Sequence, residues 1–233
     1  MTRPVSKDEV KNAILTLLKI KHLVRMAIHP VNATVLLLIP KVANPTTVTE
    51  FRPISCCSVL YKTITKVIVQ RMQGVMDKII SPPQNAFVPG RRISNNILLG
   101  QDLFHGYNRQ HLPPRCALKV DLRKAFDTLE WDFIIAMLHL FGFPPRIIMW
   151  IEECITTTSF SVLLNGEVHG FFQGARGLRQ GDPMSPYLFV LAMEVLHLLL
   201  LQRIDQSDSF QYHWRCKEMN LFNLCFPDDL LLF

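Results

Sequence analysis

Three aspartates occupy positions where carboxylates could act together in a chemical reaction. Asp121 ends the short apolar stretch LKVD, while Asp228 and Asp229 lie far downstream between the apolar runs LFNLCF and LLLF. Two aspartates at a tight turn between strands would form the tip of a β-hairpin. An ionised carboxylate at the end of a buried strand is costly unless a positive partner lies beside it. If the hairpin tip lies beside Asp121, three carboxylates converge and can bind divalent cations.

Converging carboxylates on rigid strands suit a phosphoryl-transfer centre with two Mg²⁺ ions. Hard cations take oxygen ligands, and paired metal ions stabilise both the attacking and the leaving oxygen. This pattern favours nucleotidyl transfer. A structural alternative stays open from the residues alone: Asp121 and Asp127 are helix caps or surface charges, and Asp228 and Asp229 form an ordinary turn.

The composition is that of a folded chain with a basic surface. The 233 residues are 49% hydrophobic, so one or two domains with a real core are expected. The net charge of +6 and the pI near 9.1 fit a polyanionic partner, because cations that face phosphates release counterions. The six cysteines show no C-x-x-C pair and no zinc-like spacing, so we expect reduced, mostly buried thiols in an intracellular protein.

No membrane segment is expected. The first residues, MTRPVSKDEV, are polar and have no apolar core of a signal peptide. The longest apolar tract, Tyr187–Leu201, contains Glu194 and His197 and is shorter than the ~20 residues that a bilayer span needs. A buried core helix explains this tract better.

The first half of the chain is predicted to combine helices with one strand. A capping box of Ser6 and Glu9 predicts a first helix that runs to about residue 20. The apolar stretch Val35–Ile39 suits a buried strand ended by Pro40. A long helical pattern then covers Val59–Ile79, and a further helix follows the loop QNAFVPGRRISNN.

Four cations flank these elements. Lys41 follows the strand directly, Arg52 precedes the long helix, and Arg91 and Arg92 are adjacent in the loop. Each could contact a phosphate, and arginine would do so as a bidentate donor. The alternative for each of them is a solvated surface charge.

The second half begins with a strand over Cys116–Asp121. A second capping box, Asp127 with Glu130, predicts a helix, and Pro145 predicts the start of another. Alternating residues on both sides of Asn165–Gly166 predict a β-hairpin.

A loop rich in glycine and proline, GARGLRQGDPMSP, follows the hairpin and carries Arg176, Arg179 and Gln180. Ser185 is predicted to cap the apolar helix after it. Short strands FQYHW and LFNLCF, with LLLF as the returning arm, end the chain. Because hairpins outnumber βαβ units, we predict an α+β fold with an antiparallel sheet backed by helices.

The motifs occur in a characteristic order: IPK, FRPIS, QNAFVPGRRI, KVDLRKAFDTLEWDF, GLRQGDPMSPYLF and F-x-DD. Together they resemble the reverse transcriptases of non-LTR (LINE-type) retrotransposons, particularly those of plant genomes. The resemblance covers about Val31 to Phe233.

This resemblance implies a right-hand polymerase fold. Residues 1–115 would form a partial fingers region with an N-terminal helix, residues 116–233 would form the palm, and the thumb would be absent. By similarity, Asp121, Asp228 and Asp229 would be the catalytic carboxylates and would hold two Mg²⁺ ions, for which Mn²⁺ could substitute.

The resemblance also implies a nucleotide site. Phe126 would pack against the sugar of the incoming dNTP and exclude a ribose 2′-hydroxyl, although core packing is an equal alternative from the residues. Lys41 and Arg52 would grip the triphosphate. Gln180 and Gly181 would border the nucleotide, since glycine allows close backbone approach.

The implied activity is RNA-directed DNA synthesis with an RNA template, a DNA primer and dNTPs as partners. Arg91 and Arg92 would lie near the template strand. No protein partner is predicted, and a nuclear location follows from the resemblance alone.

Three departures from the family pattern favour an alternative, a catalytically impaired retroelement remnant that at most binds nucleic acid. Pro227 precedes the aspartate pair where a small residue is usual, the segment before the IPK strand is short, and the primer-gripping segment and thumb are missing after Phe233. A third reading, a group II intron maturase-like or telomerase-like polymerase, shares the palm, but WDF and QGDPMSP favour the LINE type.

Overall fold

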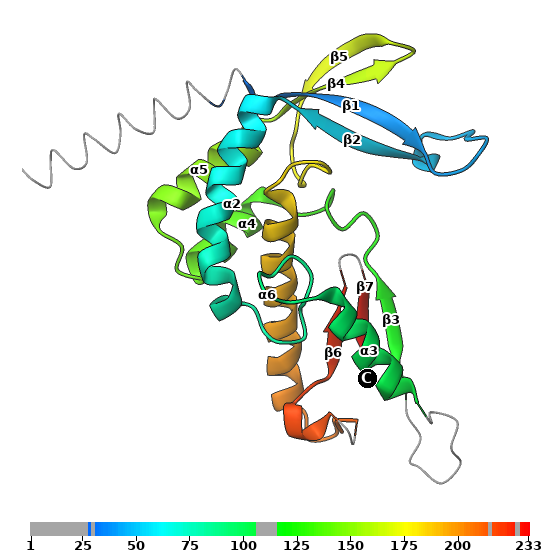
Figure 1. The fold of residues 1–233 in the computed structure, drawn as a ribbon, viewed down its shortest axis with the longest axis vertical. Coiled ribbons are helices and arrows are strands. Elements are labelled where there is room, and N and C mark those ends of the chain that lie inside the picture. The colour runs from blue at the N-terminus through cyan, green and yellow to red at the C-terminus, as the bar shows by residue number, and fades with distance from the viewer. Residues whose placement is uncertain (1–27, 29–30, 106–115, 214–215, 227–228) are drawn as a thin grey trace, which may run out of the picture.

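The structure, a computed structural model, describes residue 28 and residues 31–105, 116–213, 216–226 and 229–233 (Figure 1). The expected N-terminal helix lies outside the described residues, as do Pro227 and Asp228.

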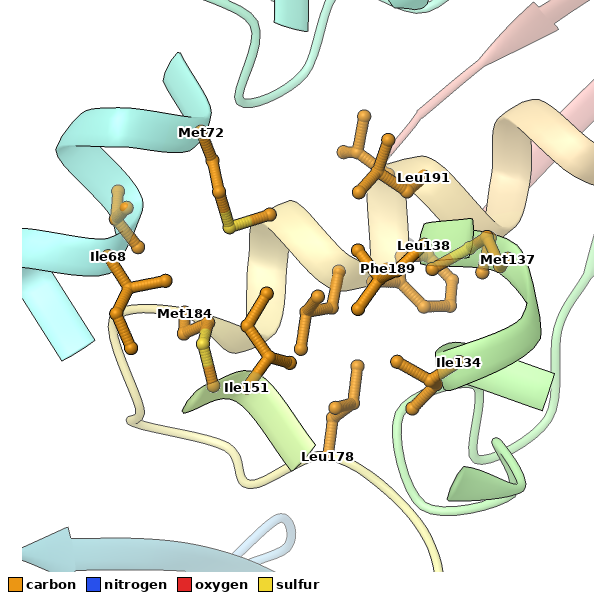
Figure 2. Close-up of a cluster of buried hydrophobic side chains, with 14 of the residues drawn as sticks. Ile68, Met72, Ile134, Met137, Leu138, Ile151, Leu178, Met184, Phe189 and Leu191 are labelled. Atoms are coloured by element: carbon orange, nitrogen blue, oxygen red, sulfur yellow. The ribbon is translucent and has the colours of Figure 1, made fainter. Parts of the chain in front are cut away.

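Four helices form one packed layer, and α6 (Ser185–Asp205) runs through the middle of the molecule (Figure 1). The apolar faces of α2, α4 and α5 meet α6 in a single cluster of buried side chains, shown in Figure 2. The three other helices of the layer are α2 (Val59–Ile79), α4 (Trp131–Leu140) and α5 (Pro145–Thr156). The shared cluster, rather than helix propensity, supplies most of the stability of such a layer.

Helix α6 is apolar nearly all round because neighbours cover it from several sides. Among the described helices, it is the one long and apolar enough to cross a membrane. Residues from Leu188 to Glu194 are buried inside the protein, which confirms the predicted core helix. The Glu194 carboxylate is buried with a partner, since it accepts hydrogen bonds from the backbone N–H and the hydroxyl of Ser81.

A four-stranded sheet lies at one end of the helical layer, at the top of Figure 1. Its strand order is β2-β1-β4-β5, with antiparallel β1·β2 and β4·β5 pairs joined by a parallel β1·β4 pair. The antiparallel prediction is therefore wrong for this one pair. The strands are β1 (Ala33–Pro40), β2 (Phe51–Cys57), β4 (Ser159–Leu164) and β5 (Glu167–Gln173).

Two features of these strands differ from the sequence prediction. FRPIS precedes the long helix as expected, but it also forms the strand β2, which was not predicted; Pro53 is tolerated there because β2 is an edge strand. The stretch Val35–Ile39 was expected to be a buried strand, yet Leu37 and Ile39 are 37% and 44% exposed. The hairpin β4·β5 is confirmed, with positive φ angles at both Asn165–Gly166 turn residues.

A three-stranded antiparallel sheet, β3-β7-β6, lies on the side of α6 opposite to α2, α4 and α5 (Figure 1). It consists of β3 (Leu118–Asp121), β7 (Asp229–Leu232) and β6 (Asn223–Cys225). Helix α3 (Ile93–Phe104) packs against β6. The antiparallel sheet expected for the palm is confirmed, and the end of the chain pairs with the strand that carries Asp121.

Three local predictions are wrong. Helix α4 begins at Trp131 without a side-chain cap, so the capping box of Asp127 and Glu130 is not formed. Helix α6 begins at Ser185 itself, with Met184 at the N-cap position and no side-chain cap; the Met184 N–H donates to Oδ1 of Asp182 at 2.9 Å. The described part of FQYHW is not a strand.

The predicted division at residue 115 does not separate the two sheets. The four-stranded sheet takes β1 and β2 from the N-terminal range and β4 and β5 from the C-terminal range. The fingers and palm ranges stay a prediction, and the parallel β1·β4 pair links them.

Candidate active site

A cavity of about 770 Å³ lies between the ends of β1 and β2, the end of β3 and the loop before α6. Six of the residues predicted from sequence line it. These are Lys41, Arg52, Asp121, Phe126, Gln180 and Gly181. The structure thus brings together side chains up to 140 positions apart along the chain.

The acidic edge of the cavity is built by strand pairing. Asp121, the last residue of β3, is the direct Cα partner of Asp229, the first residue of β7. Directly opposite residues of an antiparallel pair project from the same face, with Cβ atoms about 5 Å apart. Asp121 is exposed and lines the cavity, whereas Asp228 lies outside the described residues.

Lys119 balances part of this negative charge. Its Nζ lies 2.9 Å from Oδ2 of Asp229, and both residues are open to solvent. The hydrogen bond to Asp229, followed by the charge of that carboxylate, raises the pKa of Lys119 above its ordinary value. Two opposed carboxylates are thus close to a single cation, and a cluster of this kind can accept further positive charge.

The donor chemistry at this edge fits a hard divalent cation. Carboxylate oxygens are the ligands that Mg²⁺ and Mn²⁺ prefer. Within the described ranges, no group of three or more acidic, cysteine or histidine side chains is arranged to hold a metal ion. Since Asp228 is outside those ranges, the predicted three-carboxylate set stays a prediction.

Two cations line the cavity at the end of β1 and the start of β2. Lys41 follows β1, and its Nζ donates to the carbonyl of Thr49 at 2.9 Å. Arg52 projects from β2 and has no carboxylate partner in the part of the chain that the structure describes. Glu50 lies between them in sequence, but its carboxylate accepts the backbone N–H groups of Thr46 and Thr47, which lowers its pKa. The positive charge is thus left available for an anion.

Phe126 contributes to both the cavity wall and the core. The side chain is half-buried and stacks on Phe189 of α6, with ring centroids 4.6 Å apart. Its carbonyl accepts the N–H of Leu178 at 2.7 Å, which ties its segment to the loop before α6. The position of Phe126 is therefore compatible with both of its predicted roles, core packing and contact with the sugar of a nucleotide.

Gly181 lies where the backbone approaches another strand closely. Its φ of +108° disfavours any residue with a Cβ, and a Cβ built there would lie 2.9 Å from the carbonyl oxygen of Ser55. The preceding carbonyl, that of Gln180, accepts the Ser55 N–H at 2.8 Å. The backbone of the loop therefore passes so close to β2 at this position that only glycine fits without strain.

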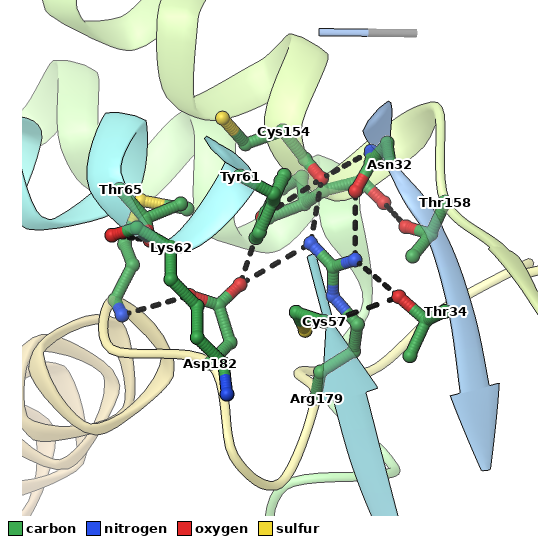
Figure 3. Close-up of polar contacts among 12 residues, drawn as sticks. Asn32, Thr34, Cys57, Tyr61, Lys62, Thr65, Cys154, Thr158, Arg179 and Asp182 are labelled. Atoms are coloured by element: carbon green, nitrogen blue, oxygen red, sulfur yellow. Dashed lines mark hydrogen bonds and ion pairs between the residues drawn. The ribbon is translucent and has the colours of Figure 1, made fainter. Parts of the chain in front are cut away.

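Sequence reasoning missed the buried polar network that supports this loop. Arg179 and Asp182 form an ion pair of 3.2 Å in which both side chains are almost fully buried (Figure 3). The sequence motif draws attention to Arg179, but nothing in it marks Asp182 as its partner beyond the fact that a cation and an anion flank Gln-Gly. Lys124 and Asp127 also line the cavity and were not predicted to do so.

Arg91 is used by the fold. Its guanidinium donates to the carbonyls of Ile80 and Ser81, both at 2.7 Å, and pairs with Asp77 at 3.0 Å. It therefore satisfies the backbone carbonyls after α2. Arg92 is exposed at the start of α3, and neither arginine lines the cavity. The prediction that Arg91 and Arg92 lie near the template strand stays a prediction, and the guanidinium of Arg91 already has these partners within the fold.

The thiols differ sharply in exposure, and this predicts their reactivity. All six cysteines are free, as expected, and burial raises the pKa of Cys154 and Cys225 to about 12. Because the thiolate is the reactive form, an aromatic disulfide reagent at neutral pH should modify two thiols rapidly and four only in denaturant. Rapid modification of Cys154 in the folded protein would contradict the structure. The exposed pair is Cys56 and Cys116, and the buried set is Cys57, Cys154, Cys216 and Cys225.

Asp121, at the edge of an antiparallel sheet and paired with Asp229, lines one cavity together with the cations Lys41 and Arg52 at the ends of strands of a second sheet. Residues 39–233 match the family described as "Reverse transcriptase (RNA-dependent DNA polymerase)". The chain belongs to this family, which confirms the resemblance to reverse transcriptases of non-LTR retrotransposons.

Curated relatives agree with this assignment. The chain is 33% identical over 170 residues to the Transposon TX1 uncharacterized 149 kDa protein of Xenopus laevis, a match that covers 73% of this chain and 13% of the relative. It is 29% identical over 235 residues to the Retrovirus-related Pol polyprotein from type-2 retrotransposable element R2DM of Drosophila melanogaster. This match covers 99% of this chain and 21% of the relative. The chain thus spans about a fifth or less of these two relatives.

A solved structure shares the fold. The apo telomerase from Candida Tropicalis, truncated from its C-terminal domain, superposes with a TM-score of 0.53 at 15% identity, covering 87% of this chain and 43% of the telomerase chain. At this identity the likeness shows the fold alone, and it confirms the predicted α+β polymerase architecture.

Proposed function

We propose that this chain carries the RNA-directed DNA polymerase centre of a non-LTR retrotransposon protein. The observation that supports this most strongly is that Asp121, the strand partner of Asp229, lines the same cavity as Lys41 and Arg52. In the reaction, the primer 3′-hydroxyl oxygen bonds to the α-phosphorus of a dNTP, and the bond to the β-phosphate breaks to release pyrophosphate.

The carboxylates of Asp121, Asp228 and Asp229 would hold the divalent ions, which we infer to be two Mg²⁺. Ions bound there would supply Lewis-acid stabilisation of the attacking and leaving oxygens. Asp121 and Asp229 come from neighbouring strands of one sheet, so hydrogen bonds between the strands fix their separation. Rigid placement matters, because small errors in the position of reacting groups cost large factors in rate.

Lys41 and Arg52 would bind the triphosphate of the incoming nucleotide. Both line the cavity that Asp121 lines, and Lys124 is a third cation among the lining residues. Concentrated positive charge in a partly enclosed site attracts an anion more strongly than the same charge on an open surface. The basic balance of the whole chain supports an RNA template and a DNA primer as further partners, and Arg92 is the exposed arginine we assign to the template.

Phe126 would select deoxyribonucleotides, and replacing it should relax this selection. In Phe126→Val, space opens on the cavity wall, and we expect use of rNTPs relative to dNTPs to rise by roughly 10- to 100-fold, the range of a steric discrimination in an apolar pocket. The measurement is kcat/KM for dTTP and for UTP on the same template.

A matched control separates selection from packing. Phe133→Val makes the same change on α4, where the side chain is 39% exposed and does not line the cavity. Its discrimination should equal that of the unchanged protein. An unchanged ratio in Phe126→Val would leave only the stacking on Phe189 as the role of this ring.

Primer extension tests the proposed function directly. Purified protein given poly(rA), oligo(dT), dTTP and Mg²⁺ should extend the primer, and omission of the metal should stop synthesis. RNA binding that weakens with salt, with no metal-dependent synthesis, would instead identify a remnant that keeps the fold without the chemistry. Nuclear action is part of the proposal on the resemblance alone.

A further inference from the structure

The loop before α6 carries a buried ion pair whose two members stand on either side of the cavity-lining dipeptide. Arg179 and Asp182 are 8% and 4% exposed, and their charged groups lie 3.2 Å apart. The residues between them, Gln180 and Gly181, line the cavity. Charges buried this deeply persist only when every charged group has partners.

Arg179 reaches three separate elements. One terminal nitrogen donates to Oδ1 of Asn32 at 2.7 Å and to the hydroxyl of Thr34 on β1 at 3.0 Å. The other donates to the carbonyl of Cys154 on α5 at 3.3 Å. The guanidinium also lies 4.1 Å from the centroid of the Tyr61 ring on α2. A single side chain therefore joins the four-stranded sheet to two helices of the core (Figure 3).

Asp182 fixes the other end of the dipeptide. Its Oδ2 accepts the hydroxyl of Tyr61 at 2.8 Å in addition to Arg179, and its Oδ1 accepts the N–H of Met184 at the start of α6. Burial, and then the neighbouring Asp182 charge, raise the pKa of Tyr61 well above its ordinary value. The hydroxyl thus keeps the proton that it donates.

The anchored dipeptide has little freedom. The Gln180 carbonyl is bonded to the N–H of Ser55 on β2, and Gly181 passes that strand at a φ of +108°. The network ties the two flanking side chains to β1, α2 and α5, so any slack in it would move the backbone that borders the cavity. Groups that orient binding residues in this way often matter as much as the binding residues.

We propose that Arg179 and Asp182 are positioning residues that set the affinity for the incoming nucleotide by holding Gln180 and Gly181 against β2. The identity of the ligand in this proposal rests on the proposed function, whereas the geometry of the loop is independent of it. Neither charged group needs to touch the nucleotide, since the effect passes through the backbone between them. Nucleotide binding should therefore weaken more than turnover slows.

The alternative is that the pair only stabilises the fold, and Glu194→Gln is the matched control. Glu194 is 1% exposed and also holds a loop through buried hydrogen bonds, but it binds Ser81, which does not line the cavity. The test variants are Arg179→Lys, which keeps the charge and loses the planar fork, and Asp182→Asn. Thr34→Val removes one acceptor of Arg179 while keeping the shape, and serves if either stronger variant fails to fold.

Steady-state kinetics on poly(rA) and oligo(dT) give the first readout. We expect KM for dTTP to rise about tenfold in Arg179→Lys and Asp182→Asn, and about threefold in Thr34→Val, with kcat lowered by less than about threefold. In Glu194→Gln, KM for dTTP should stay unchanged even though the melting temperature falls as much as in the test variants, or more. Equal KM values in the control and in all three test variants would overturn the proposal.

Amide hydrogen exchange gives a second readout that needs no catalysis. The Ser55 N–H should exchange faster in the test variants, because its acceptor, the Gln180 carbonyl, is released, and it should stay protected in Glu194→Gln. If the unchanged protein synthesises no DNA, the proposed function fails while Ser55 exchange still reports on the loop. Full protection of Ser55 in every variant would overturn the positioning role.

Discussion

Asp121→Asn is expected to lower primer extension by about 10³-fold or more. The substitution keeps the size of the side chain and removes the negative charge that would bind the divalent ions, so nearly all of the metal-dependent stabilisation of the transition state is lost. Asp121 is exposed at the end of β3 and pairs with Asp229 through the backbone, which the change leaves intact. The measurement is the single-turnover rate of dTMP addition at saturating Mg²⁺.

Asp132→Asn is the matched control for this prediction. Asp132 is an exposed aspartate in the first turn of α4 and does not line the cavity. Its loss should cost a few tenths of a kcal/mol of helix stability and leave the rate unchanged. Synthesis that survives in Asp121→Asn at the rate of the control would refute the assignment of this carboxylate as a metal ligand.

Gly181→Ala is expected to combine a loss of stability with a loss of nucleotide binding. The added methyl group would lie 2.9 Å from the Ser55 carbonyl oxygen, and the backbone at φ +108° disfavours a Cβ even without the contact. We expect a decrease of about 1–3 kcal/mol in the free energy of unfolding. Because the loop must shift away from β2, KM for dTTP should rise by roughly tenfold or more.

Gly90→Ala separates the two causes. Gly90 has a φ of +80°, but a Cβ there would meet no atom within 4 Å. This variant should lose about 1 kcal/mol from backbone strain alone and keep the KM of the unchanged protein. Equal effects of the two substitutions on KM would show that the close approach to Ser55 is not what shapes the nucleotide site.

Local patterns predicted most elements whose signals lie within one stretch of chain. The apolar period of Val59–Ile79, proline at the start of α5 and the Asn165–Gly166 turn each specify structure through interactions between residues close in sequence. No local pattern predicted the strand β2, which contains Pro53 within FRPIS. An edge strand accepts proline, and only the sheet order shows which strand is at the edge.

The candidate site was predictable to the extent that its residues stand in motifs. Six predicted residues line one cavity, and Asp121 lies opposite Asp229 as the hairpin hypothesis required. Arg91 shows the limit of this reasoning. Next to Arg92 in sequence it looked equally free, yet it caps α2 while Arg92 is exposed. Sequence adjacency does not reveal which cation has carbonyls within reach.

The sequence by itself determined most of the helices, the β4·β5 hairpin, the acidic residues at the strand ends and the reverse transcriptase family. The tertiary structure decided that β1 pairs in parallel with β4, and that Arg179 and Asp182 form a buried ion pair on either side of Gln180 and Gly181. Turns and periodicity arise from contacts a few residues apart, which a sequence displays directly. A buried ion pair that holds Asn32, Tyr61 and Cys154 depends on where distant segments pack, and that choice belongs to the core as a whole.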